Sequence, residues 1–171
     1  MRKYLSAFVC GFGAGVMQVV PLAKSFTCCI IVPLAVFFAL LLERKANNVP
    51  LYQKTDTKKG VIIGILTGIY AALFGSIFEI LITLITKNND IIVAFPEIQK
   101  FLNSLPLTED IKNQVITLFN TIIDEIKENG FSLLYSFSII INNFIVNTIF
   151  GLIGGLIGVQ IINSRISKSE K

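Results

Sequence analysis

Charged residues and histidine are scarce in this chain, and both shortages narrow its class. Charged residues make up 15% of the 171 residues, whereas a soluble domain carries about 25%. Histidine is absent, which removes the commonest metal ligand and the commonest general base. With only 3 cysteines, the chain has too few for a disulfide framework. These shortages argue against a soluble domain, a basic nucleic-acid binder and a disulfide-rich scaffold.

Apolar residues are in excess, at 53% of the chain with a mean hydropathy of +0.73. A helix needs about 20 residues to cross a hydrocarbon core of about 30 Å. Four segments approach or exceed that length: 5–23, 26–42, 61–86 and 131–163. The last is too long to lie wholly in the core, so we place its membrane part at 138–163. Because lipid leaves backbone groups no outside partner, we expect an all-α fold, an integral membrane four-helix bundle of two hairpins.

The N-terminus could also begin a signal peptide, since Met1-Arg2-Lys3 precedes an apolar run. Its cleavage site would be poor, because Pro21 stands three residues before Lys24, where a small residue is needed. We therefore expect the segment to be retained as the first membrane helix.

Lysine and arginine are distributed unevenly among the connections. Basic residues exceed acidic ones before the first span, in the connection 43–60 and in the tail after residue 163, whereas the connection 87–130 is acidic. Four crossings place all three basic pieces on one side, which the positive-inside rule makes cytoplasmic. We expect a protein of the cytoplasmic (inner) membrane, with both termini and the loop 43–60 cytoplasmic and residues 87–130 outside.

The connection 87–130 carries two helical patterns. Thr108 can cap a helix whose first turn holds Glu109 and Asp110, and Gly130 supplies a stop. A second, shorter apolar pattern covers 91–105. We expect an outer amphipathic helical segment that either rests on the membrane surface or docks a partner helix.

Small residues recur at four-residue steps in three of the four spans. Lipid offers no hydrophobic drive for helices to associate, so association depends on close backbone approach. We expect helix-packing faces, within the monomer or between copies, at Gly11 and Gly15; Gly64, Gly68 and Ala72; and Gly151 and Gly155.

Glu79 is the one ionisable residue well inside an apolar span, and such residues are functional candidates. The directions of the helices bring several amides to the same outer half of the membrane. The candidate polar intramembrane cluster consists of Glu79, Asn142, Asn143, Asn147 and Gln18. Glu79 either reaches the headgroups or accepts a hydrogen bond from an asparagine, or it forms a proton or cation site.

Cys28 and Cys29 are adjacent and could form a strained disulfide or bind a soft metal, but we expect them to pack as small buried apolar residues. With only Cys10 elsewhere and no histidine, a closed metal site lacks a fourth ligand. The sequence GFGAG lies inside an apolar span without a preceding strand, so helix packing explains its glycines better than phosphate binding. We predict no catalytic residue, no cofactor and no metal.

Three stretches carry a resemblance to a known group of proteins: GFGAG…VVPLAK…CC…PLAVFFALLLERK, KKGVIIGILTGIYAALFGS and GLIGGLIGVQIIN. The chain resembles small bacterial four-helix integral membrane proteins that are catalogued only as a domain of unknown function. The resemblance implies a glycine-rich first hairpin, a long acidic outer connection and a glycine-rich last helix with a basic tail. It implies no catalytic residue.

Two functions fit these patterns. The first is a non-enzymatic accessory or scaffold subunit acting through helix–helix assembly, with the bilayer and either a membrane-protein partner or a second copy as its contacts, and no nucleic acid. The alternative is a small transporter or channel with a proton or cation site around Glu79. An intramembrane enzyme ranks third, because the sequence offers no serine–histidine pair, aspartate pair or metal cluster.

Overall fold

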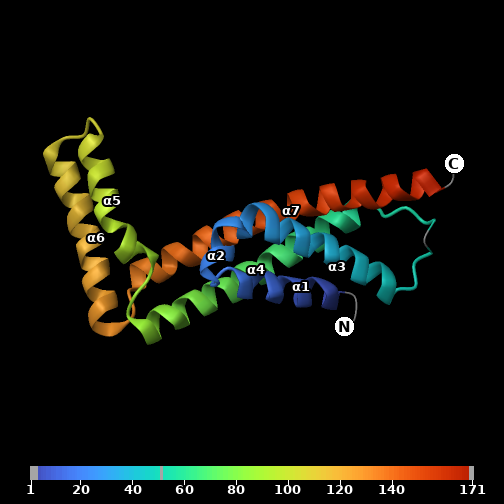
Figure 1. The fold of residues 1–171 in the computed structure, drawn as a ribbon, viewed down its shortest axis with the longest axis horizontal. Helices are drawn as coiled ribbons and strands as arrows, with labels where there is room; N and C mark the ends of the chain where they lie inside the picture. The colour runs from blue at the N-terminus through green and yellow to red at the C-terminus, as the bar shows by residue number, and fades with distance from the viewer. Residues whose placement is uncertain (1–3, 51, 170–171) are drawn as a thin grey trace. The chain divides into compact units, whose positions relative to one another are not determined.

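The computed structural model describes residues 4–50 and 52–169, and these contain helices and no strand. The elements in chain order are α1 (Leu5–Met17), α2 (Pro21–Phe26), a π-helical turn (Thr27–Ile31), α3 (Val32–Ala46), α4 (Thr57–Thr86), α5 (Asp90–Ser104), α6 (Glu109–Asn129) and α7 (Leu133–Ser169) (Figure 1). The predicted all-α class is confirmed.

Three of the helical stretches among the described residues are long and apolar enough to cross a membrane: Pro21–Ala46, Thr57–Thr86 and Leu133–Ser167. The helix α1 is apolar as well, but it has only 13 residues. Three of the four predicted spans therefore reach the required length, and the first is shorter than we expected.

The turn of the first hairpin lies earlier than the predicted spans 5–23 and 26–42 place it. The helix α1 ends at Met17, and α2 begins at Pro21. Proline has no N–H to continue a helix and disfavours helical geometry in the residue before it. Val20 is accordingly extended, with φ −81° and ψ 119°. The boundary between the two helices is thus set by Pro21 and not by Lys24.

A second proline shapes the middle of the following helix. Pro33 cannot donate to the carbonyl four residues before it, and its ring would clash with that carbonyl in a regular helix. The chain instead widens into the π-helical turn, where the Val32 N–H donates to the Thr27 carbonyl. The Thr27 hydroxyl also donates to the Ala23 carbonyl at 2.8 Å. Together α2, the π turn and α3 form one continuous helical stretch.

The other boundaries also extend the predicted helices. The helix α3 continues to Ala46 and α4 begins at Thr57, so the loop predicted at 43–60 shrinks to 47–56. The helix α7 begins at Leu133 and continues to Ser169, beyond both ends of the predicted span 138–163. Hydropathy marks only the apolar part of a helix, and the ends beyond residues 42, 61 and 163 are polar. The start of α7 belongs to the apolar run 131–163, of which we had placed only 138–163 in the membrane.

The chain divides into two compact units, and the first holds the described residues up to Phe78 and from Ile140 onward. In it α1 packs against α3, and both contribute to a core with α4 and α7 (Figure 1). The core residues are Ala7, Val36, Ala39, Leu40, Ile63, Val159, Ile162 and Ile166. All four helices therefore share one apolar interior.

The second unit, Glu79–Ile139, contains the packed pair α5 and α6 (Figure 1). The Asn89 side chain accepts from two backbone N–H groups at the start of α5. Gly130 ends α6 in the left-handed conformation, with φ 72°. Thr108 occupies the N-cap position of α6, but its side chain makes no capping hydrogen bond. The two helices predicted in the connection 87–130 are confirmed. Thr108 stands at the predicted N-cap position, but it does not make the predicted capping hydrogen bond.

The apolar faces of the second unit turn towards each other. The rings of Phe95 in α5 and Phe119 in α6 have centroids 6.1 Å apart. Ile122 and Ile126 of α6 form a buried cluster with Tyr135 at the start of α7. Much of the amphipathic pattern seen in the sequence is therefore satisfied by packing inside this unit.

Candidate functional site

A seam of glycines joins α4 to α7. A Cβ atom added to Gly64 would overlap the Gly151 carbonyl oxygen and lie 3.2 Å from the Gly155 Cα. A Cβ atom on Gly68 would lie 2.9 Å from the Asn147 carbonyl carbon. The obstructing atoms are backbone, so they cannot rotate away. The two helices touch backbone to backbone along this seam.

A similar contact joins α1 to α4. A Cβ atom on Gly11 would lie 2.6 Å from the Tyr70 Cβ, and one on Gly15 would lie 2.7 Å from the Phe74 Cβ. Ala72 of the same α4 stripe is fully buried. The structure places the predicted packing glycines in contacts inside the chain, whereas the sequence left open whether they join separate copies.

Three of the predicted polar residues meet in the first unit. The Gln18 Nε2 donates to the Asn147 Oδ1 and to the Ala71 carbonyl, both at 3.2 Å. The Asn147 Nδ2 in turn donates to the Asn143 carbonyl at 2.9 Å. The Asn143 Nδ2 donates to the Ser76 hydroxyl at 3.0 Å. We call these side chains, Gln18, Ser76, Asn143 and Asn147, the amide cluster.

The amide cluster ties together the end of α1, the middle of α4 and the first half of α7. Gln18 and Asn147 are 7% and 3% exposed, and a buried amide is costly unless it is hydrogen-bonded. Gly75 leaves the room for Gln18, because a Cβ atom there would overlap that side chain. Ser76 was not among the predicted site residues, although it continues the small stripe of α4 in four-residue steps.

The other two predicted site residues have different surroundings. Asn142 is exposed, one position round the helix from Asn143. Glu79 belongs to the second unit, where its Oε1 lies 3.5 Å from the hydroxyl of Tyr135. Tyr135 is 8% exposed, and no pattern in the sequence had indicated it as a partner of Glu79. The carboxylate and the phenol form a second polar contact between α4 and α7.

The adjacent cysteines lie in the π-helical turn. Both are free thiols, with their Sγ atoms 3.5 Å apart. Cys29 is exposed and Cys28 is half-buried, so Cys29 does not pack as a buried apolar residue. Among the described residues, no three histidine, cysteine or acidic side chains gather closely enough to hold a metal ion.

A polar network that sequence reasoning missed organises the loop 47–56. The Arg44 guanidinium donates to the Thr55 hydroxyl at 2.6 Å and to the carbonyls of Gln53 and Pro50 at 2.8 and 3.0 Å. Asn163 of α7 accepts from the Thr55 N–H at 2.8 Å and donates to its carbonyl at 3.0 Å. This loop is therefore fixed to the ends of α3 and α7.

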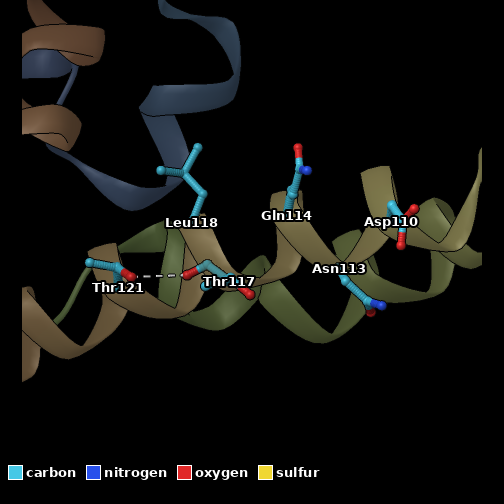
Figure 2. A pocket seen from close by; sticks show the side chains of 6 residues that line it. All are labelled: Asp110, Asn113, Gln114, Thr117, Leu118 and Thr121. Carbon is cyan, nitrogen blue, oxygen red and sulfur yellow. Dashed lines mark hydrogen bonds between the residues drawn. The ribbon is translucent and has the colours of Figure 1, made fainter.

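One exposed face of α6 carries an open hollow of about 600 Å³. Figure 2 shows its six lining residues, which follow one face of the helix: Asp110, Asn113, Gln114, Thr117, Leu118 and Thr121. The Thr121 hydroxyl donates back to the Thr117 carbonyl at 3.0 Å. Five of the six side chains are polar, so this face is suited to water or to a polar partner.

No protein-family model, curated protein or solved structure matches this chain. The fold defines an all-helical protein with three apolar helices compatible with membrane insertion.

Proposed function

We propose that the chain is an integral protein of the cytoplasmic membrane and a non-enzymatic accessory or scaffold subunit that acts through helix–helix assembly. In this proposal α1, the stretch α2–α3, α4 and α7 form a four-helix bundle in the membrane. The glycine-to-glycine contact between α4 and α7 supports the bundle, and the exposed face of α6 is the surface at which we propose that a partner binds. Helices in lipid associate through such close backbone contacts, because the hydrophobic effect gives no drive there.

The order of the helix ends supports the predicted orientation. Tyr4 at the start of α1, Glu43 near the end of α3 and Lys59 at the start of α4 line one hollow. Asn163 near the end of α7 is bonded to Thr55 at the same end of the unit. This end also carries the basic connection and the basic tail, so we place it in the cytoplasm. Residues 87–130 then lie outside.

The short length of α1 explains why its end is bonded to the amide cluster. A helix of 13 residues rises about 20 Å, whereas the hydrocarbon core is about 30 Å thick. If α1 starts at the cytoplasmic face, its end at Gln18 lies within the hydrocarbon. Irregular backbone at that depth must be enclosed by protein. Gln18 at this turn is buried and bonded to Asn147 and to the Ala71 carbonyl, so its amide is surrounded by protein at that depth.

Glu79 lies much nearer the opposite face in this arrangement. It follows Lys59 by 20 residues along α4, a rise of about 30 Å. Tyrosine is favoured at the membrane interface, and Tyr135 lies within hydrogen-bonding distance of the Glu79 carboxylate. This depth favours a structural hydrogen bond at the outer interface over an ion site inside the membrane.

The scaffold proposal is tested by isolating the protein from native membranes in a mild detergent. We expect a partner in stoichiometric amount, released by Leu118→Arg on the exposed face of α6. The matched control is Asn120→Arg, which adds the same charge at another exposed position. Recovery of the chain without a partner, or of a partner that both variants retain equally, contradicts assembly through α6.

A small transporter or channel is the second candidate, and the Glu79–Tyr135 contact within two apolar helices is the observation that favours it. Proteoliposomes loaded with a pH-sensitive dye measure proton flux directly. Flux that Glu79→Gln abolishes supports the transporter, because glutamine keeps the hydrogen bond and loses the charge. The scaffold proposal expects no flux from either protein.

A further inference from the structure

A hollow of about 310 Å³ lies where α1 begins, α3 ends and α4 begins. Its polar lining consists of Tyr4, Glu43, Asp56, Lys58 and Lys59. The isoleucines of the first turns of α4, Ile62 and Ile63, line its apolar part. Its volume falls at the lower end of the range for small-molecule sites, about 300–1,000 Å³.

The charges in the hollow are held in place by the fold. Glu43 is 4% exposed, and its Oε2 lies 2.7 Å from the Lys59 ammonium. The Asn47 Nδ2 donates to the Glu43 Oε1, also at 2.7 Å. The Asp56 carboxylate accepts from the Lys58 N–H at 3.2 Å, at the start of α4. The hollow therefore contains one ion pair, Glu43 with Lys59, and two exposed charges, the Asp56 carboxylate and the Lys58 ammonium.

The apolar part of the hollow continues to the surface of the bundle. Ile63 is buried, whereas Ile62 is 47% exposed. A ligand seated among the charged groups can therefore extend along Ile62 into an apolar environment. Charges of both signs next to an apolar surface match a zwitterionic phospholipid, whose headgroup carries both charges and whose acyl chains are apolar.

We propose that this hollow binds the headgroup of a zwitterionic aminophospholipid, with its ammonium at the exposed Asp56 carboxylate and its phosphate at Lys58 and Lys59. The inference rests on the proposed membrane location. A purely anionic headgroup would face the Asp56 carboxylate, and a quaternary ammonium could donate no hydrogen bond to it. Basic groups at the cytoplasmic ends of membrane helices are suited to lipid phosphates, and the Asp56 carboxylate adds selectivity for a primary ammonium.

Native mass spectrometry of the full chain, released from nanodiscs, tests this selectivity. The nanodiscs contain equal parts of phosphatidylethanolamine, phosphatidylcholine and phosphatidylglycerol. One charge-assisted hydrogen bond corresponds to about a tenfold difference in binding, so we expect about tenfold more retained phosphatidylethanolamine than phosphatidylcholine. Equal retention of all three lipids, or preference for phosphatidylglycerol, overturns the proposal.

Two conservative variants locate the site. Asp56→Asn removes a carboxylate but keeps an oxygen that can cap α4, and Lys58→Gln removes an exposed ammonium. Asp56→Asn should abolish the preference, whereas Lys58→Gln should lower the retention of all three lipids, because each of them carries the phosphate. Lys54→Gln, in the same loop but outside the hollow, should change neither. If Asp56→Asn keeps the preference, or Lys58→Gln leaves the retention of all three lipids unchanged, the lipid binds elsewhere and the proposal is wrong.

Membrane extraction separates this inference from the proposed function. A chain that alkaline wash releases from membranes refutes both. A chain that stays in the membrane fraction and binds the three lipids equally refutes the lipid site alone.

Discussion

Replacing Gly64 with alanine tests the seam between α4 and α7. The added methyl group would overlap the Gly151 carbonyl oxygen and lie 3.1 Å from the carbonyl carbon, closer than ordinary contact. Only a separation of the helices can relieve this, because the obstructing atoms belong to the backbone. Such overpacking costs about 1–3 kcal/mol.

Gly13→Ala is the matched control, since a Cβ atom at Gly13 meets nothing within 4 Å. Both substitutions gain the same helix propensity, about 1 kcal/mol, so the difference between the variants isolates the contact. For a chain of this size about 2–4 °C corresponds to 1 kcal/mol. Gly64→Ala should therefore melt roughly 2–12 °C below Gly13→Ala in detergent.

The comparison extends to larger side chains. Gly68→Leu should lower the melting temperature further, because its side chain would meet the Asn147 backbone. Leu81→Ala, which shortens a 45% exposed side chain, should have little effect. A Gly64→Ala protein that melts at or above Gly13→Ala would refute the reasoning.

Three further predictions concern the polar contacts and the turn after α6. Asn147→Leu should lower the free energy of unfolding in detergent by about 0.6–1.7 kcal/mol, from the average to the largest value measured for hydrogen bonds between membrane helices, whereas Asn142→Leu at the exposed neighbour should be neutral. Arg44→Lys should speed tryptic cleavage after Lys54 in inverted membrane vesicles, because lysine cannot reproduce the forked contacts that hold the loop; an unchanged cleavage rate contradicts this role. Gly130→Ala should destabilise the second unit by at least about 1 kcal/mol, measured by the protease resistance of residues 87–130, because its φ is 72° and Leu84 crowds the added methyl group.

Hydropathy and helix periodicity predicted the class of the fold and most helix positions. These signals are local, since each depends on residues within a few turns of one another. The helices α5 and α6 illustrate this, because apolar spacing located both of them and Gly130 marked the end of α6. The pairing of their apolar faces through Phe95 and Phe119 could not be predicted. The periodicity of a helix shows that it has an apolar face, but it does not show which other element packs on that face.

The misplaced boundaries have a different cause. The apolar run of the first hairpin continues through Pro21 and Pro33, so hydropathy alone cannot divide it correctly. Proline geometry places the turn at residues 18–20, just before Pro21, whereas the charge at Lys24 suggests a later turn. The π-helical turn depends on how the backbone relaxes around Pro33, and composition does not encode that choice.

The candidate site was predictable in part. Successive spans cross the membrane in opposite directions, and this alternation predicted similar depths for Gln18, Asn143 and Asn147. The structure joins the three residues by hydrogen bonds. The partnership of Glu79 with Tyr135 required the rotation of α4 against α7, which the periodicity of either helix leaves open. The network around Arg44 depends on a loop whose path only the tertiary contacts define.

Reporter fusions after Lys54, Asn113 and Lys171 test the central claim most directly. An integral membrane bundle with both termini in the cytoplasm predicts that they read inside, outside and inside. The two inside positions follow basic segments, whereas Asn113 lies in the acidic connection 87–130. An outside reading at Lys171, or an inside reading at Asn113, would contradict the claim.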